Sequence, residues 1–298
     1  RDTAVAMGKF DGLHIVHRKL LDLVLRQRDQ RLAPCVFTFD PSPAVFFGLS
    51  DGRELMTREE KRRAFERMGV ELLIEFPLTE KSAAMEPEAF AEQILAKRMR
   101  TRYIAAGEDV SFGRRGSGNG ALLRRLGKLY GYEVQTIEKL RLHGREVSST
   151  YVRSRLEAGE VKEVAELLGD YYTIEGRVCH GARLGHDLGM PTVNLLPPVN
   201  KLLPPYGVYF SRVLYRGNVY GAISNVGCKP TVAQRGLPGV ETYLYDFDRE
   251  IYGEEIRVQL LAFRRPELHF PSVDALRAQI LADMEAGREY ARENMKIV

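Results

Sequence analysis

The sequence predicts an α/β domain built on a doubly wound parallel sheet, followed by a small antiparallel β-barrel with a C-terminal helix. Over residues 1–170, short β-like runs alternate with helical periodicity, which is typical of a parallel sheet covered by helices. Over residues 171–298, β-like runs follow one another between Gly, Pro and Asp, and a helical pattern appears only at the end. The length of 298 residues agrees with two domains of about 150 residues each.

The elements of the first domain are expected to alternate along the chain. The expected strands are Thr3–Met7, Pro34–Phe39, Val70–Phe76, Tyr103–Ala106 and Glu133–Ile137. The expected helices are His14–Arg28, Arg58–Met68, Glu86–Arg100, Gly120–Tyr130, Ser149–Leu156 and Val161–Leu168, with Thr57 capping the second of them. Ligands of such sheets bind beyond the carboxyl ends of the strands, where glycine-rich loops lead into helices.

The second domain is expected to contain mostly strands. These are Tyr172–His180, Gly207–Tyr215, Val219–Val226, Val240–Phe247 and Glu255–Phe263. The closing helix is predicted over Val273–Asn294, with Ser272 as its N-cap and with Ala275, Leu276, Ile280 and Met284 on one face.

Composition excludes several classes of protein. With 44% hydrophobic and 28% charged residues the chain is neither disordered nor collagen-like, and no apolar stretch approaches the ~20 residues of a membrane span. The net charge of +4 suits small anionic ligands but falls short of a dedicated DNA-binding protein. Cys35, Cys179 and Cys228 lie far apart without a CxxC pair, which predicts neither a zinc site nor disulfides and favours the reducing cytoplasm.

The sharpest motif of the first domain is GKFDGLHIVH, which spans Gly8 to His17 between a strand and a helix. Gly8 and Gly12 allow a tight turn, and His14 and His17 share one face of the first helical turn. Free backbone N–H groups and the helix dipole attract phosphate at such a place, where two imidazoles can stabilise charge on a phosphate. The alternative is a helix start with two exposed histidines.

Two further segments carry groups that suit a nucleotide. GEDVSFGRRGSGNG, residues 107–120, is a basic glycine-rich loop after a strand, and an ordinary surface loop is the alternative. VSSTYVRSRL, residues 147–156, offers hydroxyl groups at a helix start, and an N-cap cluster is the alternative. The sequence contains no GxxxxGK[ST], which excludes a P-loop.

Together these motifs, in this order and spacing, resemble the adenylyltransferase half of bacterial bifunctional riboflavin kinase/FAD synthetases, a branch of the nucleotidyltransferases. The resemblance implies that His14 and His17 act on the phosphates of ATP. It implies that the residues around ATP are Gly8, Phe10, Asp11, Gly12, Ser149, Thr150 and Arg153. It places the loop of Asp109 near the adenine or the flavin, with Asp109 and Phe112 as the expected flavin-binding residues.

The second domain carries a glycine-rich motif of its own, GRVCHGARLGHDLGMPTVNL, residues 176–195. Gly181, Gly185 and Gly189 let backbone amides wrap a phosphate. Thr192 and Asn194 supply hard oxygen donors that suit Mg²⁺ held by nucleotide phosphates. A glycine-rich β-turn followed by a Pro-Thr turn is the alternative.

Downstream, SNVGCKPTV, VETYLYDFDREIYG, FRRPELHF and QILADMEAGREY follow in order, so that residues 172–292 resemble riboflavin kinase. The resemblance implies that Glu241 is the catalytic base and that Tyr243 and Arg264 contact the flavin. A carboxylate suits this role because phosphorylation of a 5′-hydroxyl requires a proton acceptor.

We therefore predict a bifunctional transferase that phosphorylates riboflavin to FMN in residues 171–298 and adenylylates FMN to FAD in residues 1–170. ATP is the expected co-substrate and Mg²⁺ the expected cofactor, with no nucleic acid or membrane partner. One alternative is a kinase with a weak or inactive transferase, because Val16 stands where the family has a glycine between the two histidines. The other is a nucleotide- or RNA-binding regulator without turnover, suggested by the basic stretch KRMRTR at residues 97–102.

Overall fold

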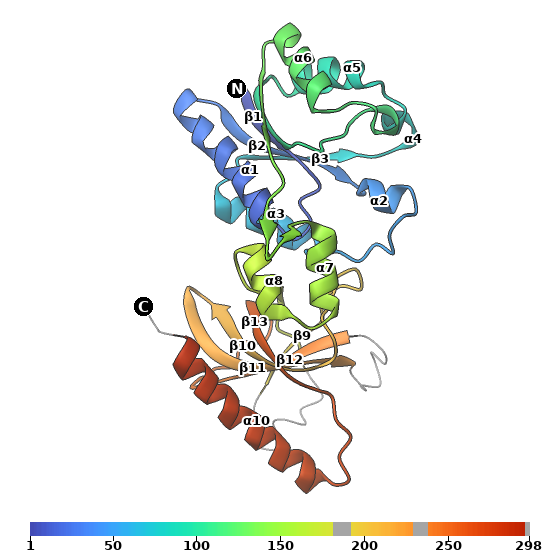
Figure 1. Cartoon of the computed structure of the whole chain (residues 1–298). Coiled ribbons are helices and arrows are strands. Elements are labelled where there is room, and N and C mark those ends of the chain that lie inside the picture. The colour runs from blue at the N-terminus through green and yellow to red at the C-terminus, as the bar shows by residue number, and fades with distance from the viewer. Residues whose placement is uncertain (181–191, 229–237, 296–298) are drawn as a thin grey trace. The chain divides into compact units, whose positions relative to one another are not determined.

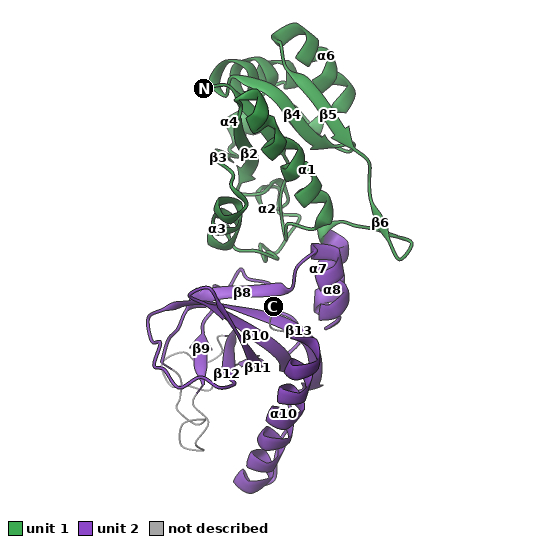
Figure 2. Cartoon of the chain, turned by 90° about the vertical axis from the view of Figure 1, so that its left-hand side faces the viewer, with its two compact units in different colours: residues 1–149 green, residues 150–298 purple. Residues whose placement is uncertain are grey.

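The chain forms two compact units, residues 1–149 and residues 150–298 (Figure 2). The structure is a computed structural model that describes residues 1–180, 192–228 and 238–295. Two short helices, α7 (Ser149–Glu157) and α8 (Val161–Leu168), belong to the second unit, except for Ser149, the first residue of α7. The functional boundary near residue 170 stays a prediction.

The first unit contains a parallel sheet with the strand order β3-β2-β1-β4-β5, whose strands are labelled in Figures 1 and 2. Its strands are β1 (Thr3–Met7), β2 (Ala33–Asp40), β3 (Leu72–Pro77), β4 (Thr101–Gly107) and β5 (Glu133–Ile137). The order shows that the chain runs outward to β3 and then returns past β1 to form β4. Because β1 and β4 are adjacent, the loops that follow them begin side by side at the carboxyl edge of the sheet. Ligands bind at this position in sheets of this type.

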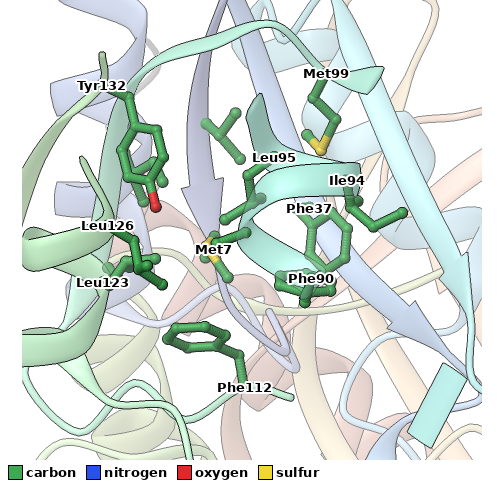
Figure 3. Close-up of a cluster of buried hydrophobic side chains, with 14 of the residues drawn as sticks. Met7, Phe37, Phe90, Ile94, Leu95, Met99, Phe112, Leu123, Leu126 and Tyr132 are labelled. Atoms are coloured by element: carbon green, nitrogen blue, oxygen red, sulfur yellow. The ribbon is translucent and has the colours of Figure 1, made fainter. Parts of the chain in front are cut away.

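Helices cover both faces of this sheet, as predicted. They are α1 (Ile15–Arg26), α3 (Arg58–Met68), α5 (Pro87–Phe90) with its π-helical continuation Ala91–Arg98, and α6 (Gly120–Tyr130). Alternate residues of β1 enter two separate cores: Val5 and Met7 pack with α5 and α6 (Figure 3), and Ala4 and Ala6 pack with α1 and α3. The central strand is therefore buried on both faces, which is why it lacks polar alternation.

Several short elements of the first unit were not predicted. These are α2 (Pro43–Phe46), α4 (Glu80–Ala83) and a hairpin formed by β6 (Arg141–Leu142) and β7 (Arg145–Glu146). The predicted cap of α3 is confirmed, because Thr57 and Glu60 form a reciprocal capping box.

The second unit is a curled antiparallel sheet with the order β8-β13-β10-β11-β12-β9. Its strands are β8 (Tyr172–Arg177), β9 (Val193–Leu195), β10 (Gly207–Tyr215), β11 (Asn218–Cys228), β12 (Pro238–Leu244) and β13 (Glu255–Pro266). A bridge between Cys179, just after β8, and Asn194 of β9 joins the two edges of the sheet. The predicted small barrel is therefore confirmed, and its closing strand β9 was missed because it is only three residues long.

The C-terminal helix α10 (Val273–Asn294) packs on the outer face of β10 and β11 (Figure 1). Ser272 caps it, as predicted. The residues predicted on one face, Ala275, Leu276, Ile280 and Met284, are all half-buried, whereas Arg277 and Leu281 are exposed. The fully buried residues are Asp283, which pairs with Arg265 at 2.7 Å, and Gly287, where a Cβ would meet the Tyr245 hydroxyl. Met284 packs against the apolar cluster of Val208, Ile223 and Tyr245.

Candidate functional site

The first candidate site is the turn between β1 and α1. Gly8 donates its N–H to the carbonyl of Phe37 on the neighbouring strand, which fixes the start of the turn. Phe10, Gly12 and Leu13 then adopt positive φ angles of 51°, 84° and 48°. Phe10 is fully buried against the edge of Phe65, with 5.6 Å between the ring centroids. The predicted need for glycine is met at Gly12, but the turn uses two further left-handed positions that the sequence did not reveal.

His14 and His17 lie together at the first turn of α1. His14 is the N-cap, and its Nδ1 accepts the backbone N–H of His17 at 3.4 Å. The two rings stack with centroids 3.7 Å apart and an angle of 13° between their planes. The predicted pairing is therefore present, and the histidines are not the exposed pair of the alternative interpretation, since His14 is only 5% exposed.

Burial keeps both imidazoles neutral. It lowers the pKa of His14 to about 4, although the nearby Asp11 carboxylate opposes this change. It lowers the pKa of His17 well below its ordinary value, with a further lowering from His14. Within the described part of the chain the buried Nδ1 of His17 has no hydrogen-bond partner. A neutral imidazole offers one N–H and one acceptor, so each ring can give one hydrogen bond to a phosphate oxygen.

Asp11 and Ser149, predicted near ATP from distant parts of the sequence, are brought together. The Ser149 hydroxyl donates to the main-chain carbonyl of Asp11 at 2.8 Å, and the Asp11 carboxylate accepts the N–H of Leu55 at 2.8 Å. Thr150, the next residue of α7, and Arg153, one turn further on, fall in the second unit, so their role with ATP stays a prediction.

The two flavin candidates of the first unit lie in different environments. Asp109 is exposed in the loop after β4, with its carboxylate 3.8 Å from the Lys139 ammonium. Phe112 is 2% exposed and packs beside Phe90 in the apolar core, with 5.9 Å between the ring centroids. Because a flavin would have to displace core packing to reach it, we do not include Phe112 in the proposed site.

The second candidate site lies on β9 and β12 of the barrel. The ladder places Glu241 directly opposite Asn194, so their side chains share one face of the sheet. The Thr192 hydroxyl donates to the Glu241 carboxylate at 2.6 Å. Three predicted residues from segments 49 positions apart thus meet at one place. Gly181, Gly185 and Gly189 lie outside the described residues.

Sequence reasoning missed Asn225, which lies opposite Glu241 on the other neighbouring strand, β11. It stands within the quoted SNVGCKPTV motif, but only the register shows that it faces Glu241. The predicted flavin residues lie toward α10. Tyr243 packs, as Met284 of α10 does, against the buried cluster that includes Tyr245, and Arg264 pairs with Asp283 at 3.5 Å.

Other features bear on the alternatives. Within the described ranges, no helix is long and apolar enough to cross a membrane, and no group of three or more His, Cys, Asp or Glu could hold a metal ion. All three cysteines are free thiols. In the basic stretch KRMRTR, Lys97 pairs with Glu92, whereas Arg100 and Arg102 pair with Asp2. These ion pairs offset part of the charge on which the RNA-binding alternative depends.

Comparison with known proteins decides the family. Residues 1–151 match the FAD synthetase family and residues 168–291 match the riboflavin kinase family. The chain belongs to the bifunctional riboflavin kinase/FMN adenylyltransferases. Members from Listeria monocytogenes and Escherichia coli K12 are 32% and 33% identical to it, over 96% of this chain and 91% and 92% of theirs.

A solved structure extends the likeness to the fold. A crystal structure described as a macrolide-efflux protein from Streptococcus pneumoniae superposes with a TM-score of 0.83 and 29% identity. The match covers 96% of this chain and 94% of that one. The two-unit architecture is therefore shared with a protein of nearly the same extent.

Proposed function

We propose that this riboflavin kinase/FMN adenylyltransferase performs its two reactions at the two sites described above. The observation that carries the proposal is the meeting of Thr192, Asn194 and Glu241 across β9 and β12. It unites a carboxylate base with two oxygen donors, which phosphoryl transfer to an alcohol requires.

In the kinase reaction, Glu241 accepts the proton of the riboflavin 5′-hydroxyl while that oxygen bonds to the γ-phosphorus of ATP. The bond from the γ-phosphorus to its bridging oxygen breaks, and ADP leaves. The Thr192 hydroxyl orients the Glu241 carboxylate through its 2.6 Å hydrogen bond. A charge-assisted bond of this kind is among the stronger hydrogen bonds of proteins, so the base is fixed before the substrate arrives.

The donor set of this site fits Mg²⁺, because hydroxyl, amide and carboxylate oxygens are the ligands that this ion prefers. Thr192 and Asn194 are the residues that would hold it together with the phosphates of ATP. When bound, the ion would neutralise charge on those phosphates.

In the transferase reaction, a phosphate oxygen of FMN attacks the α-phosphorus of ATP, and pyrophosphate leaves. His14 and His17 would donate hydrogen bonds to the phosphate oxygens where negative charge builds up. Their neutrality does not prevent this, since each ring retains one N–H. The free N–H groups at the start of α1 would add to this stabilisation.

The direct test is incubation of the protein with riboflavin, ATP and Mg²⁺, followed by chromatographic separation of the flavins. We expect FMN to appear first and FAD to follow, with one ADP formed for each riboflavin phosphorylated and one pyrophosphate for each FAD. Failure to form FMN would refute the kinase assignment. Failure to form FAD, also from added FMN, would refute the transferase assignment.

One observation favours a second candidate, a competent kinase with a slow transferase. Val16 occupies the second position of α1, between His14 and His17, where its isopropyl group is only partly buried. A β-branched side chain has restricted rotamers in a helix, so it cannot easily turn away from an approaching nucleotide.

The setting that suits these reactions is the cytoplasm, where ATP is available and the free thiols of Cys35, Cys179 and Cys228 stay reduced. The proposed partners are the small molecules riboflavin, FMN and ATP, without nucleic acid or membrane.

A further inference from the structure

Asn225 stands on the face of the barrel that carries the proposed base. It lies directly opposite Glu241 of β12, and Asn194 of β9 lies opposite Glu241 on the other side. Residues that are directly opposite in an antiparallel pair point to the same face, with Cβ atoms about 4.5–5.5 Å apart. The half-buried Asn225 side chain is therefore the neighbour of the Glu241 side chain on β11.

Glu267 sets the orientation of the Asn225 amide. Asn225 Nδ2 donates a long hydrogen bond of 3.5 Å to Glu267 Oε1. The carboxylate reaches this place over Gly227, two residues further along β11, where a Cβ atom would collide with Oε1. A carboxylate only accepts hydrogen bonds, so it selects the nitrogen of the amide. Because the oxygen of an amide points away from its nitrogen, Asn225 Oδ1 is turned away from Glu267.

The face therefore presents two hydrogen-bond acceptors on neighbouring strands, the Glu241 carboxylate and Asn225 Oδ1. Two such acceptors suit a substrate that carries two hydroxyl donors on adjacent carbons. The ribityl chain of riboflavin carries this pair, since its 4′-hydroxyl is next to the 5′-hydroxyl that is phosphorylated.

The strand order indicates the direction in which the substrate extends. From Asn225 the ladder continues to Val208 on β10 and then to Arg265 on β13. Three strand intervals of ~4.8 Å place β13 about 14 Å from β12. The predicted flavin residue Arg264 also belongs to β13. A substrate whose 5′-hydroxyl lies at Glu241 and whose ring extends toward β13 must lay its polyol chain across β11, where Asn225 stands.

We propose that Asn225 is a specificity-determining residue of the kinase, whose Oδ1 accepts the 4′-hydroxyl of the ribityl chain, and that Glu267 is its positioning residue. The inference rests on the proposed kinase function and deepens it. The substrate class becomes a primary alcohol with a second hydroxyl on the adjacent carbon, because an analogue without that hydroxyl leaves the Asn225 acceptor without its donor.

The test combines a variant with a substrate analogue. kcat/KM for phosphorylation is measured with riboflavin and with 4′-deoxyriboflavin, in the wild-type protein and in Asn225→Ala. We expect each single change to lower kcat/KM ~10-fold. With 4′-deoxyriboflavin the variant should stay within about threefold of the wild type, because both changes remove the same hydrogen bond. Two independent factors that multiply to ~100-fold would overturn the proposal.

A second analogue and a second variant serve as controls. 2′-Deoxyriboflavin lacks a hydroxyl at the ring end of the chain, so Asn225→Ala should still cost ~10-fold with it. Loss of the Asn225 effect with this analogue, in place of the 4′-deoxy analogue, would overturn the assignment. Asn218→Ala changes the same residue type at the far end of β11, where Nδ2 donates to the Arg216 carbonyl at 3.4 Å, and should leave kcat/KM unchanged.

Folding of the second unit is checked within that unit, by amide hydrogen exchange of β10, β11 and α10 in each variant. Should Asn225→Ala lose this protection, Glu267→Ala carries the same cycle, because Glu267 is exposed and its removal frees the amide to turn. Its smaller loss with riboflavin, about threefold, should vanish with 4′-deoxyriboflavin. A wild-type protein that does not phosphorylate riboflavin would refute the kinase function and this inference with it. A wild-type protein that phosphorylates riboflavin and 4′-deoxyriboflavin equally well would refute the inference alone.

Discussion

Replacement of Glu241 by glutamine removes the proposed base with little change of shape. In the wild-type protein the Thr192 hydroxyl donates a 2.6 Å hydrogen bond to the Glu241 carboxylate. Glutamine retains one oxygen that can accept this hydrogen bond, so the side chain can keep its position. What is lost is the ability to take the 5′-hydroxyl proton. Loss of a general base costs ~10²–10⁴ in rate, which is about 2.7–5.4 kcal/mol at 1.36 kcal/mol per tenfold change.

The assay is FMN formation from riboflavin and ATP under saturating conditions, with riboflavin affinity measured separately by flavin fluorescence. We expect kcat to fall by the stated factor, affinity to change little, and FAD formation from added FMN to continue. Glu255→Gln is the control, because this carboxylate lies on β13 and pairs with Arg177 at 3.7 Å on the surface. If Glu241→Gln phosphorylates riboflavin at a near-normal rate, Glu241 is not the base.

Three other predictions concern single residues. Asn194→Ala should abolish most FMN formation, because it removes an oxygen donor opposite Glu241, while FAD formation from supplied FMN continues; equal loss of both activities would contradict this. Val16→Gly should raise the rate of FAD formation about tenfold for each ~1.4 kcal/mol by which it relieves a steric clash with ATP. The glycine should destabilise α1 by less than ~1 kcal/mol. An unchanged rate would show that the nucleotide does not contact Val16. The His14 ring should titrate near pH 4 in an NMR pH series. Since its folded-state pKa lies below the ordinary 6.5, stability should be full above pH 6.5 and fall between pH 6.5 and 4, whereas a titration near 6.5 would refute the burial argument.

Much of the architecture followed from local patterns. The bounds of α3, α6, α8, β5, β10 and α10 agree with the sequence prediction to the residue, because caps, turns and hydrophobic periodicity are encoded within a few positions. The candidate site residues His14, His17, Thr192, Asn194 and Glu241 were also identified from motifs. Their chemistry is a property of the residue type, and their spacing places them at the ends or on the faces of predicted elements.

Only the tertiary structure decided how distant segments meet. The register that sets Asn194 and Asn225 on either side of Glu241 depends on strand pairing, which no local pattern specifies. Likewise, Asp11 acquires its partners Leu55 and Ser149 through long-range packing. The burial that makes the histidines neutral and places Phe112 in the core is a sum over many neighbours. Side-chain chemistry is local, whereas register, burial and pKa arise from contacts between residues far apart in the chain.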